Sequence, residues 1–181
     1  ASIMEPLFGL DPTQVDLDHR LTTASFTHPL GTDELGRDLL ARLLRGGQVS
    51  LIVGLSAAVI SAVIGTIVGL IAGYYGGRMD GLLMRLTDGV IALPLLPLLI
   101  VLAAVDLNKL GLSESLAQNP DIDLYRIIFI IALVGWTTVA RLVRGASLSV
   151  RELDFVSAAT ASGASDLRIM AIHILPNVVT P

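Results

Sequence analysis

The chain has 181 residues, of which 53% are hydrophobic and only 15% are charged. Soluble domains average about 45–50% apolar and about 25% charged residues, so this balance favours a membrane protein. The net charge of −4, with only 12 scattered lysines and arginines, excludes a nucleic-acid partner, and the absence of cysteine excludes disulfides and thiolate metal sites.

The N-terminal part of the chain predicts a polar segment followed by a short helix. Residues 1–31 are acidic and rich in proline and glycine, which indicates an irregular segment outside the bilayer. The stretch 32–47 predicts a separate amphipathic helix, capped by Thr32 and ended by Gly46-Gly47. This helix either lies at the membrane surface or packs on its own protein.

The remainder of the chain, 48–181, contains uncharged apolar runs that predict membrane spans. Three of them cover about 51–73, 89–105 and 124–140, and a fourth begins at 169 and continues to 181. At about 1.5 Å per residue, the first run exceeds the roughly 30 Å of a bilayer core. The third run is shorter and relies on flanking residues to complete a span.

Glycines and prolines inside the predicted spans point to special packing. Gly65, Gly69 and Gly73 recur every fourth residue and leave one face of the first span small. Homodimerisation through this stripe and packing within the same bundle are the two interpretations. Pro94 and Pro97 are expected to kink or break the second span. Such a break either lines a pathway or reflects kinked packing alone.

The distribution of charge predicts the orientation. The stretch 106–123 is acidic, whereas 74–88 and 141–168 carry arginines. By the positive-inside rule, the arginine-rich stretches are cytoplasmic, and 106–123 and the N-terminal segment are external. An external N-terminal segment also implies an earlier span outside this sequence.

The cytoplasmic stretch after the third span, 141–176, has the pattern of two short helices. Small residues predict one helix that ends at Gly163, and Ser165 can cap a second helix. Pro176 disfavours helical geometry at Leu175 and predicts a bend there. By themselves, these features also suit an ordinary connector between spans.

This stretch resembles the cytoplasmic loop of permease subunits of ATP-binding-cassette (ABC) importers. That loop has the pattern Glu-Ala-Ala, three residues, Gly, nine residues, Ile-x-Leu-Pro. Two positions depart from it, since Ser157 stands where glutamate is usual and His173 where isoleucine is usual. The resemblance implies that partner ATPases dock on Ser157, Ala158, Ala159, Gly163, Ala164, Asp166, Leu175 and Pro176.

Other stretches resemble one branch of these proteins, the dipeptide/oligopeptide/nickel permeases. They cover residues 28–38, 72–78, 84–88, 140–145 and 174–177. The branch implies an all-α integral membrane protein with the helix bundle of a type I ABC importer permease, of which this sequence is part. It also implies a multi-pass protein of the bacterial inner membrane that imports peptides or, alternatively, nickel or another small solute.

The same resemblance implies the partners: a second related permease in a heterodimer, two cytoplasmic ATPases, an external substrate-binding protein and membrane lipid. The sequence has no Gly-x-x-x-x-Gly-Lys-Ser/Thr loop, so ATP and Mg are expected on partner subunits and no cofactor on this chain. No enzyme activity, catalytic site or metal site is predicted, because His19 and His28 are expected outside the membrane and His173 inside.

Two alternatives come from other classes of protein. An ion-coupled secondary transporter would be expected to carry ionisable residues within its spans, and the first two predicted spans have none. A non-transporting membrane scaffold is disfavoured by the prolines and glycines in the spans.

Overall fold

The structure is a computed structural model that describes residues 11–104 and 120–179. Helices dominate these residues, and the isolated β-bridge among them joins Thr32 to Asp38. Two of the described helices are long and apolar enough to cross a membrane. These helices agree with the all-α membrane helix bundle that the resemblance implies and with the membrane protein that the composition predicts.

The chain divides into two compact units, and the first ends at Gly54. Its described part contains turns, the 3-10 helix η1 (Leu17–His19) and the beginning of α2 (Leu39–Tyr75). The predicted helix 32–47 is wrong at its start, because residues 32–38 form a turn. Asp38 caps α2 instead, since its Oδ1 accepts a hydrogen bond from the Ala41 N–H at 2.8 Å.

The predicted end of that helix is also wrong, because α2 continues through Gly46-Gly47 to Tyr75. Glycine commonly ends a helix by adopting a left-handed conformation, and neither of these glycines has a positive φ. Inside a helix, a glycine costs only about 1 kcal/mol relative to alanine. The long apolar run that follows keeps the helix going, so the predicted surface helix and the predicted span 51–73 form one element.

The second unit, Leu55–Pro181, contains the rest of α2 and all later helices. Gly76 and Gly77, with φ of 64° and 53°, turn the chain between α2 and α3 (Gly77–Ile91). The stretch 74–88, which connects the first two predicted spans, is therefore mostly helix. Its charges alternate with leucines at helical spacing, a pattern that is as typical of an amphipathic helix as of a loop.

The second predicted span, 89–105, is not one helix. It covers the end of α3, a break at 92–94 and α4 (Leu95–Ala104), and its last residue lies outside the described residues. A ten-residue helix is about 15 Å long and cannot cross a bilayer alone. Pro94 lies in the break, whereas Pro97 lies in the first turn of α4. The N–H groups of a first turn have no partner within the helix, so a proline there breaks no helical hydrogen bond.

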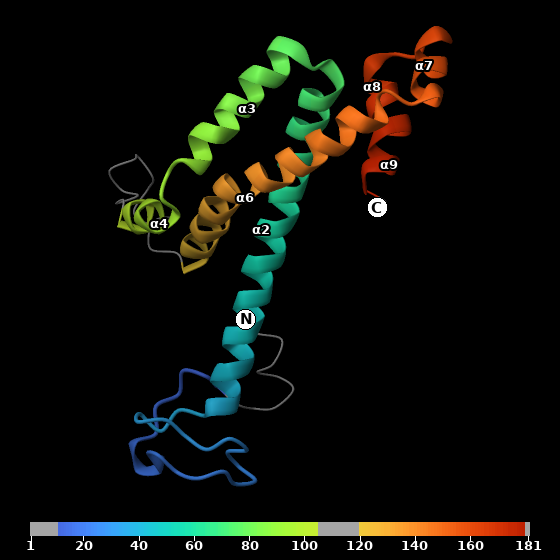
Figure 1. The fold of residues 1–181 in the computed structure, drawn as a ribbon. Coiled ribbons are helices and arrows are strands. Elements are labelled where there is room, and N and C mark those ends of the chain that lie inside the picture. The colour runs from blue at the N-terminus through green and yellow to red at the C-terminus, as the bar shows by residue number, and fades with distance from the viewer. Residues whose placement is uncertain (1–10, 105–119, 180–181) are drawn as a thin grey trace. The chain divides into compact units, whose positions relative to one another are not determined.

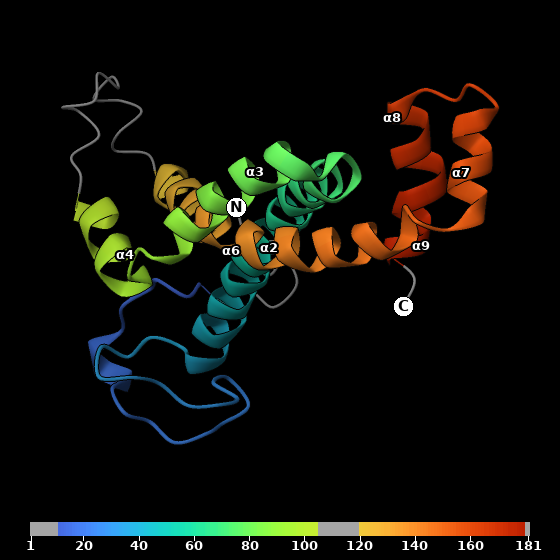
Figure 2. The same ribbon diagram turned by 45° about the horizontal axis from the view of Figure 1, so that its top comes forward.

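The third predicted span, 124–140, is only part of α6 (Pro120–Val150). The helix passes Arg141, which directly follows the predicted span, and Arg144, because both arginines form ion pairs with α3. Figures 1 and 2 show α6 crossing α2 and leading into the cluster of short helices at the C-terminal end of the described chain.

That cluster contains α7 (Asp154–Ala161), α8 (Asp166–Arg168), the π-helix η3 (Ile169–Ile174) and α9 (Leu175–Val179). The predicted bend at Leu175 is wrong, because Leu175 has helical dihedral angles (φ −52°, ψ −47°). The wider π-helical turn before Pro176 accommodates a residue that has no N–H to donate. The fourth predicted span thus begins within a continuous helical stretch, and residues 180–181 lie outside the described residues.

Candidate functional site

Residues 154–168, here called the knob, form two short helices that lie side by side and are joined at Gly163 (Figure 2). Gly163 has a φ of 80°, and its N–H donates to the Thr160 carbonyl at 3.0 Å. A Cβ at this position would meet no atom within 4 Å. The knob therefore needs glycine for its left-handed backbone and not for space.

The residues predicted to dock the ATPase fall into an outer and an inner set. The exposed residues are Ser157, Ala158, Gly163, Asp166 and Pro176. The inner set, Ala159, Ala164 and Leu175, is partly buried against a hydrophobic core. Ser165 occupies the N-cap position of α8, but its side chain makes no capping hydrogen bond. The outer face of α7 is thus a surface of small side chains that a partner can approach closely.

One hydrophobic core joins the knob to the long helices. Leu70 of α2 and Val143 of α6 pack with Val156 of α7. Ile169 and Ile174 of η3 complete this core and have no exposed surface. Because the core contains residues of α2, α6 and α7, a displacement of the knob is opposed by both long helices.

The carboxylate of Asp166 joins the knob to the end of α2. The Tyr74 hydroxyl donates to its Oδ1 at 2.8 Å, and the Tyr75 hydroxyl donates to its Oδ2 at 3.1 Å. The two tyrosine rings meet edge to face, with centroids 5.1 Å apart. Asp166 was predicted to contact an ATPase, yet both of its carboxylate oxygens bind groups of its own chain.

Arg151, in the turn between α6 and α7, makes a second connection to α2. Its Nη1 donates to the carbonyls of Gly73 and Tyr74 at 3.1 and 3.2 Å. The last carbonyls of a helix have no intrahelical partner and carry partial negative charge. The guanidinium therefore satisfies the C-terminal end of α2 and neutralises part of its dipole.

Two ion pairs connect α3 to α6. Arg144 forms a bidentate pair with Asp80, in which Nη2 and Oδ2 are 2.6 Å apart. Arg141 pairs with Asp88 at 2.5 Å, and both of these side chains are more exposed. These pairs explain how α6 carries two arginines beyond the predicted end of the span, since each charge has a partner.

The glycine stripe of α2 faces α6. A Cβ at Gly65 would lie 2.6 Å from the Trp136 carbonyl oxygen, and one at Gly69 would lie 2.6 Å from that of Ala140. At Gly73 the nearest atom would be the Ser147 Cβ, at 2.5 Å. Packing within the same chain, one of the two interpretations of the stripe, thus accounts for all three glycines.

An apolar groove of about 540 Å³ lies between α2, α3 and α6. Its lining residues are Ile60, Ile64, Val68, Leu86, Tyr125, Ile128, Phe129, Ala132, Leu133 and Trp136. The groove offers only a phenol and an indole as polar side chains, which does not suit the many polar groups of a peptide backbone. Neither Pro94 nor Pro97 belongs to this lining.

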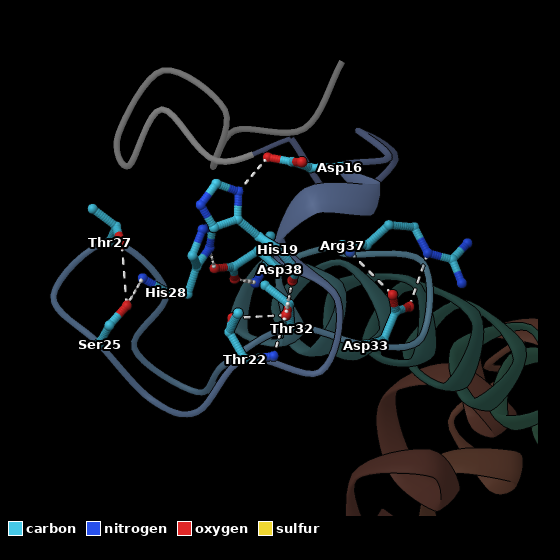
Figure 3. Close-up of polar contacts among 11 residues, drawn as sticks. Asp16, His19, Thr22, Ser25, Thr27, His28, Thr32, Asp33, Arg37 and Asp38 are labelled. Atoms are coloured by element: carbon cyan, nitrogen blue, oxygen red, sulfur yellow. Dashed lines mark hydrogen bonds and ion pairs between the residues drawn. The ribbon is translucent and has the colours of Figure 1, made fainter.

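The first unit holds a separate polar network (Figure 3). His28 Nδ1 lies 3.0 Å from Asp38 Oδ2, and Thr22 and Thr32 share a hydrogen bond of 2.8 Å. Asp33 accepts hydrogen bonds from the N–H groups of Leu35 and Arg37 at 2.8 and 3.0 Å. These groups satisfy one another, so the network stabilises the loop that precedes α2.

Asp33 is the most perturbed of the acids in this loop. Burial by itself would raise its pKa, but the backbone N–H groups of Arg37 and Leu35 and the Arg37 guanidinium outweigh this effect. Together they lower the pKa of Asp33 to about 2. The carboxylate therefore stays charged at any physiological pH.

Sequence reasoning missed Tyr74, Tyr75, Arg151 and the Asp80–Arg144 pair. The tyrosines directly precede the Gly76-Gly77 turn, and this position at the end of a long apolar helix is the one signal that the sequence offers for them. Nothing in the sequence pairs Asp80 with Arg144, which are 64 residues apart.

Residues 65–181 match the family described as "Binding-protein-dependent transport system inner membrane component". This match covers more than half of the chain. The chain belongs to this family. The match includes α3, α4, α6, the knob and the part of α2 from Gly65 onward, so these elements lie within a membrane component of transport systems.

Several curated members of this permease family are similar to the chain. A putative peptide transport system permease protein of Brucella suis is 40% identical over 170 residues, which cover 94% of this chain and 52% of the relative. The probable D,D-dipeptide transport system permease protein of Escherichia coli K12 is 39% identical over 171 residues (94% and 53%). The oligopeptide transport system permease protein of Bacillus subtilis is 35% identical over 179 residues (98% and 54%). The chain thus spans about half the length of these relatives.

Proposed function

We propose that this chain forms part of a permease subunit of an ABC importer that moves dipeptides and oligopeptides across the bacterial inner membrane in a multi-pass protein. The names of the similar permeases support peptides as the substrate class. The observation that carries the proposal is the knob, an exposed surface of small side chains anchored in the same core as α2 and α6. Such a surface is suited to receive a partner protein and to pass its movement to the membrane helices.

The ATPase would dock on the outer face of the knob, at Ser157, Ala158 and Gly163. Arg168 lies in the knob and Arg151 directly precedes it, and both favour a cytoplasmic location for the knob, where the ATPases are expected. ATP and Mg would bind to two partner ATPases. A second, related permease and an external binding protein would complete the transporter, and this chain would contribute no catalytic residue of its own.

Exchanging Gly163 for valine tests the docking role. A left-handed conformation costs an L-residue about 1–2 kcal/mol, and a β-branched side chain is still less tolerant, so the ratio of native to non-native knob falls roughly 5- to 30-fold. We expect Gly163→Val to insert normally in the membrane but to lose ATPase co-purification and peptide uptake. Gly163→Asn is the matched control, because asparagine tolerates this conformation.

Co-purification from detergent-solubilised membranes then discriminates between the classes of function. An importer subunit retains its ATPases, and peptide stimulates ATP hydrolysis in the complex. Peptide uptake that needs an ion gradient but no ATPase would instead indicate a secondary transporter. A chain that binds partners without any uptake would indicate a scaffold. Uptake that is unchanged in Gly163→Val contradicts docking at the knob.

A further inference from the structure

The contact between Asp166 and the two tyrosines has properties that hydrophobic packing alone lacks. Each carboxylate oxygen of Asp166 accepts a hydrogen bond from a different tyrosine, at 2.8 and 3.1 Å. Hydrogen bonds to a charged acceptor are directional and stronger than those between neutral groups. Because Tyr74 and Tyr75 are consecutive on α2, they approach the carboxylate from two directions. The contact therefore fixes both the distance and the rotation of α8 relative to the end of α2.

The helix to which the tyrosines belong is tightly joined to the rest of the second unit. The three glycines of its stripe bring α2 into contact with α6, at distances that leave no room for a single added carbon. Leu70 of α2 also lies in the hydrophobic core shared with the knob. A movement that reaches the end of α2 is therefore passed along the whole packed pair of helices.

The location of the contact makes it a link between the docking surface and the membrane. Asp166 is the first residue of α8, three positions after the left-handed Gly163, and its side chain is exposed to solvent. Tyr75 is the last residue of α2. No other side chain of the knob makes a hydrogen bond to α2 among the residues that the structure describes.

We infer that Asp166 is a positioning residue, which Tyr74 and Tyr75 hold so that movement of the ATPase-docking knob is transmitted to α2. The inference rests on the proposed function, because it assumes that an ATPase moves the knob. It assigns Asp166 a role different from direct ATPase binding. Without the two hydrogen bonds, the knob still binds the ATPase, but it rotates on its hydrophobic core and α2 no longer follows it completely.

The test uses Asp166→Asn and the double variant Tyr74→Phe/Tyr75→Phe in the assembled transporter in lipid nanodiscs. Two matched controls remove similar groups elsewhere. Glu152→Gln changes an exposed carboxylate next to the knob, and Tyr125→Phe removes a hydroxyl at the far end of α6. The first measurement is hydrogen exchange of the knob amides. The second is the number of peptide molecules transported per ATP hydrolysed. This ratio does not change if a variant only lowers the amount of folded transporter.

We expect both test variants to retain the ATPases, to exchange the knob amides about fivefold faster or more, and to transport several-fold less peptide per ATP. Both controls should behave like the wild type. Unchanged exchange, or an unchanged transport ratio, overturns the positioning role while leaving the proposed function standing. Loss of the ATPases from the test variants alone also overturns it, since Asp166 would then bind the ATPase. A wild-type chain that retains no ATPase overturns the proposed function and this inference together.

Discussion

Exchanging Gly65 for alanine should separate α2 from α6. The added Cβ would lie 2.6 Å from the Trp136 carbonyl oxygen and 2.6 Å from the Val139 Cβ. Packed carbon atoms are about 3.5–4.0 Å apart, so the contact with Val139 is about 1 Å too short. The atoms involved belong to the backbone and to a Cβ, which no rotamer change can move. Overpacking of this kind costs about 1–3 kcal/mol, and we expect the upper half of that range.

The natural fluorescence of the protein reports on this interface. Trp136 is the single tryptophan of the chain, and only 6% of its surface is exposed. Unfolding by sodium dodecyl sulfate in mixed micelles, followed by Trp136 emission, should show a lower midpoint for Gly65→Ala than for the wild type. A loss of about 2 kcal/mol corresponds to a roughly 30-fold smaller ratio of folded to unfolded protein.

The matched control is Gly54→Ala in the same helix. A Cβ at Gly54 would meet no atom within 4 Å, so this exchange adds helix propensity without a clash. We expect Gly54→Ala to unfold at or slightly above the wild-type midpoint. Equal midpoints for Gly65→Ala and Gly54→Ala would refute the reasoning, because the close approach of α2 and α6 would then carry no energetic consequence.

Two further predictions concern charged groups. Since the pKa of Asp33 is lowered to about 2, its stabilising contacts are complete above about pH 4 and are lost as the pH falls toward 2. Limited proteolysis with pepsin, which remains active in acid, should therefore show the loop opening over that range in the wild type but not in Asp33→Asn, with Glu34→Gln as the control. A wild-type loop equally resistant at pH 4 and pH 2 would contradict this. Asp80→Asn should destabilise the contact between α3 and α6 by about 1–2 kcal/mol, because Arg144 loses a partly buried partner. Asp88→Asn breaks the more exposed ion pair and should lower the free energy of unfolding by less than Asp80→Asn in the same Trp136 assay. A larger loss for Asp88→Asn than for Asp80→Asn would contradict the greater burial of the Asp80–Arg144 pair.

Local patterns predicted those elements in which the sequence itself supplies the interactions. The knob is an example: short helices on either side of Gly163 follow from small residues, a left-handed glycine and a polar residue before the second helix. The glycine stripe likewise predicts a close helix neighbour, since spacing alone places three glycines on one face. Which helix that neighbour is does not follow from spacing.

The boundaries of the long helices were predicted less well. The third span was predicted to end at 140, directly before Arg141, yet α6 passes through Arg141 and Arg144 because α3 supplies a carboxylate for each. In the same way, Gly46-Gly47 suggested an end that the following apolar run overrides. A charge or a glycine ends a helix only when no tertiary contact or longer pattern favours its continuation, and one residue cannot show which case applies.

Composition and local spacing by themselves determined that this protein is helical, enters the membrane and carries two short helices joined at a glycine near the C-terminal end of this sequence. Those properties depend on intrinsic hydrophobicity and on contacts between residues close in the chain. Only the tertiary structure decided that Asp166 binds Tyr74 and Tyr75, some 90 positions earlier, and therefore faces its own chain. A carboxylate and a phenol are common side chains with many possible partners, so their pairing depends on the path of the intervening helices.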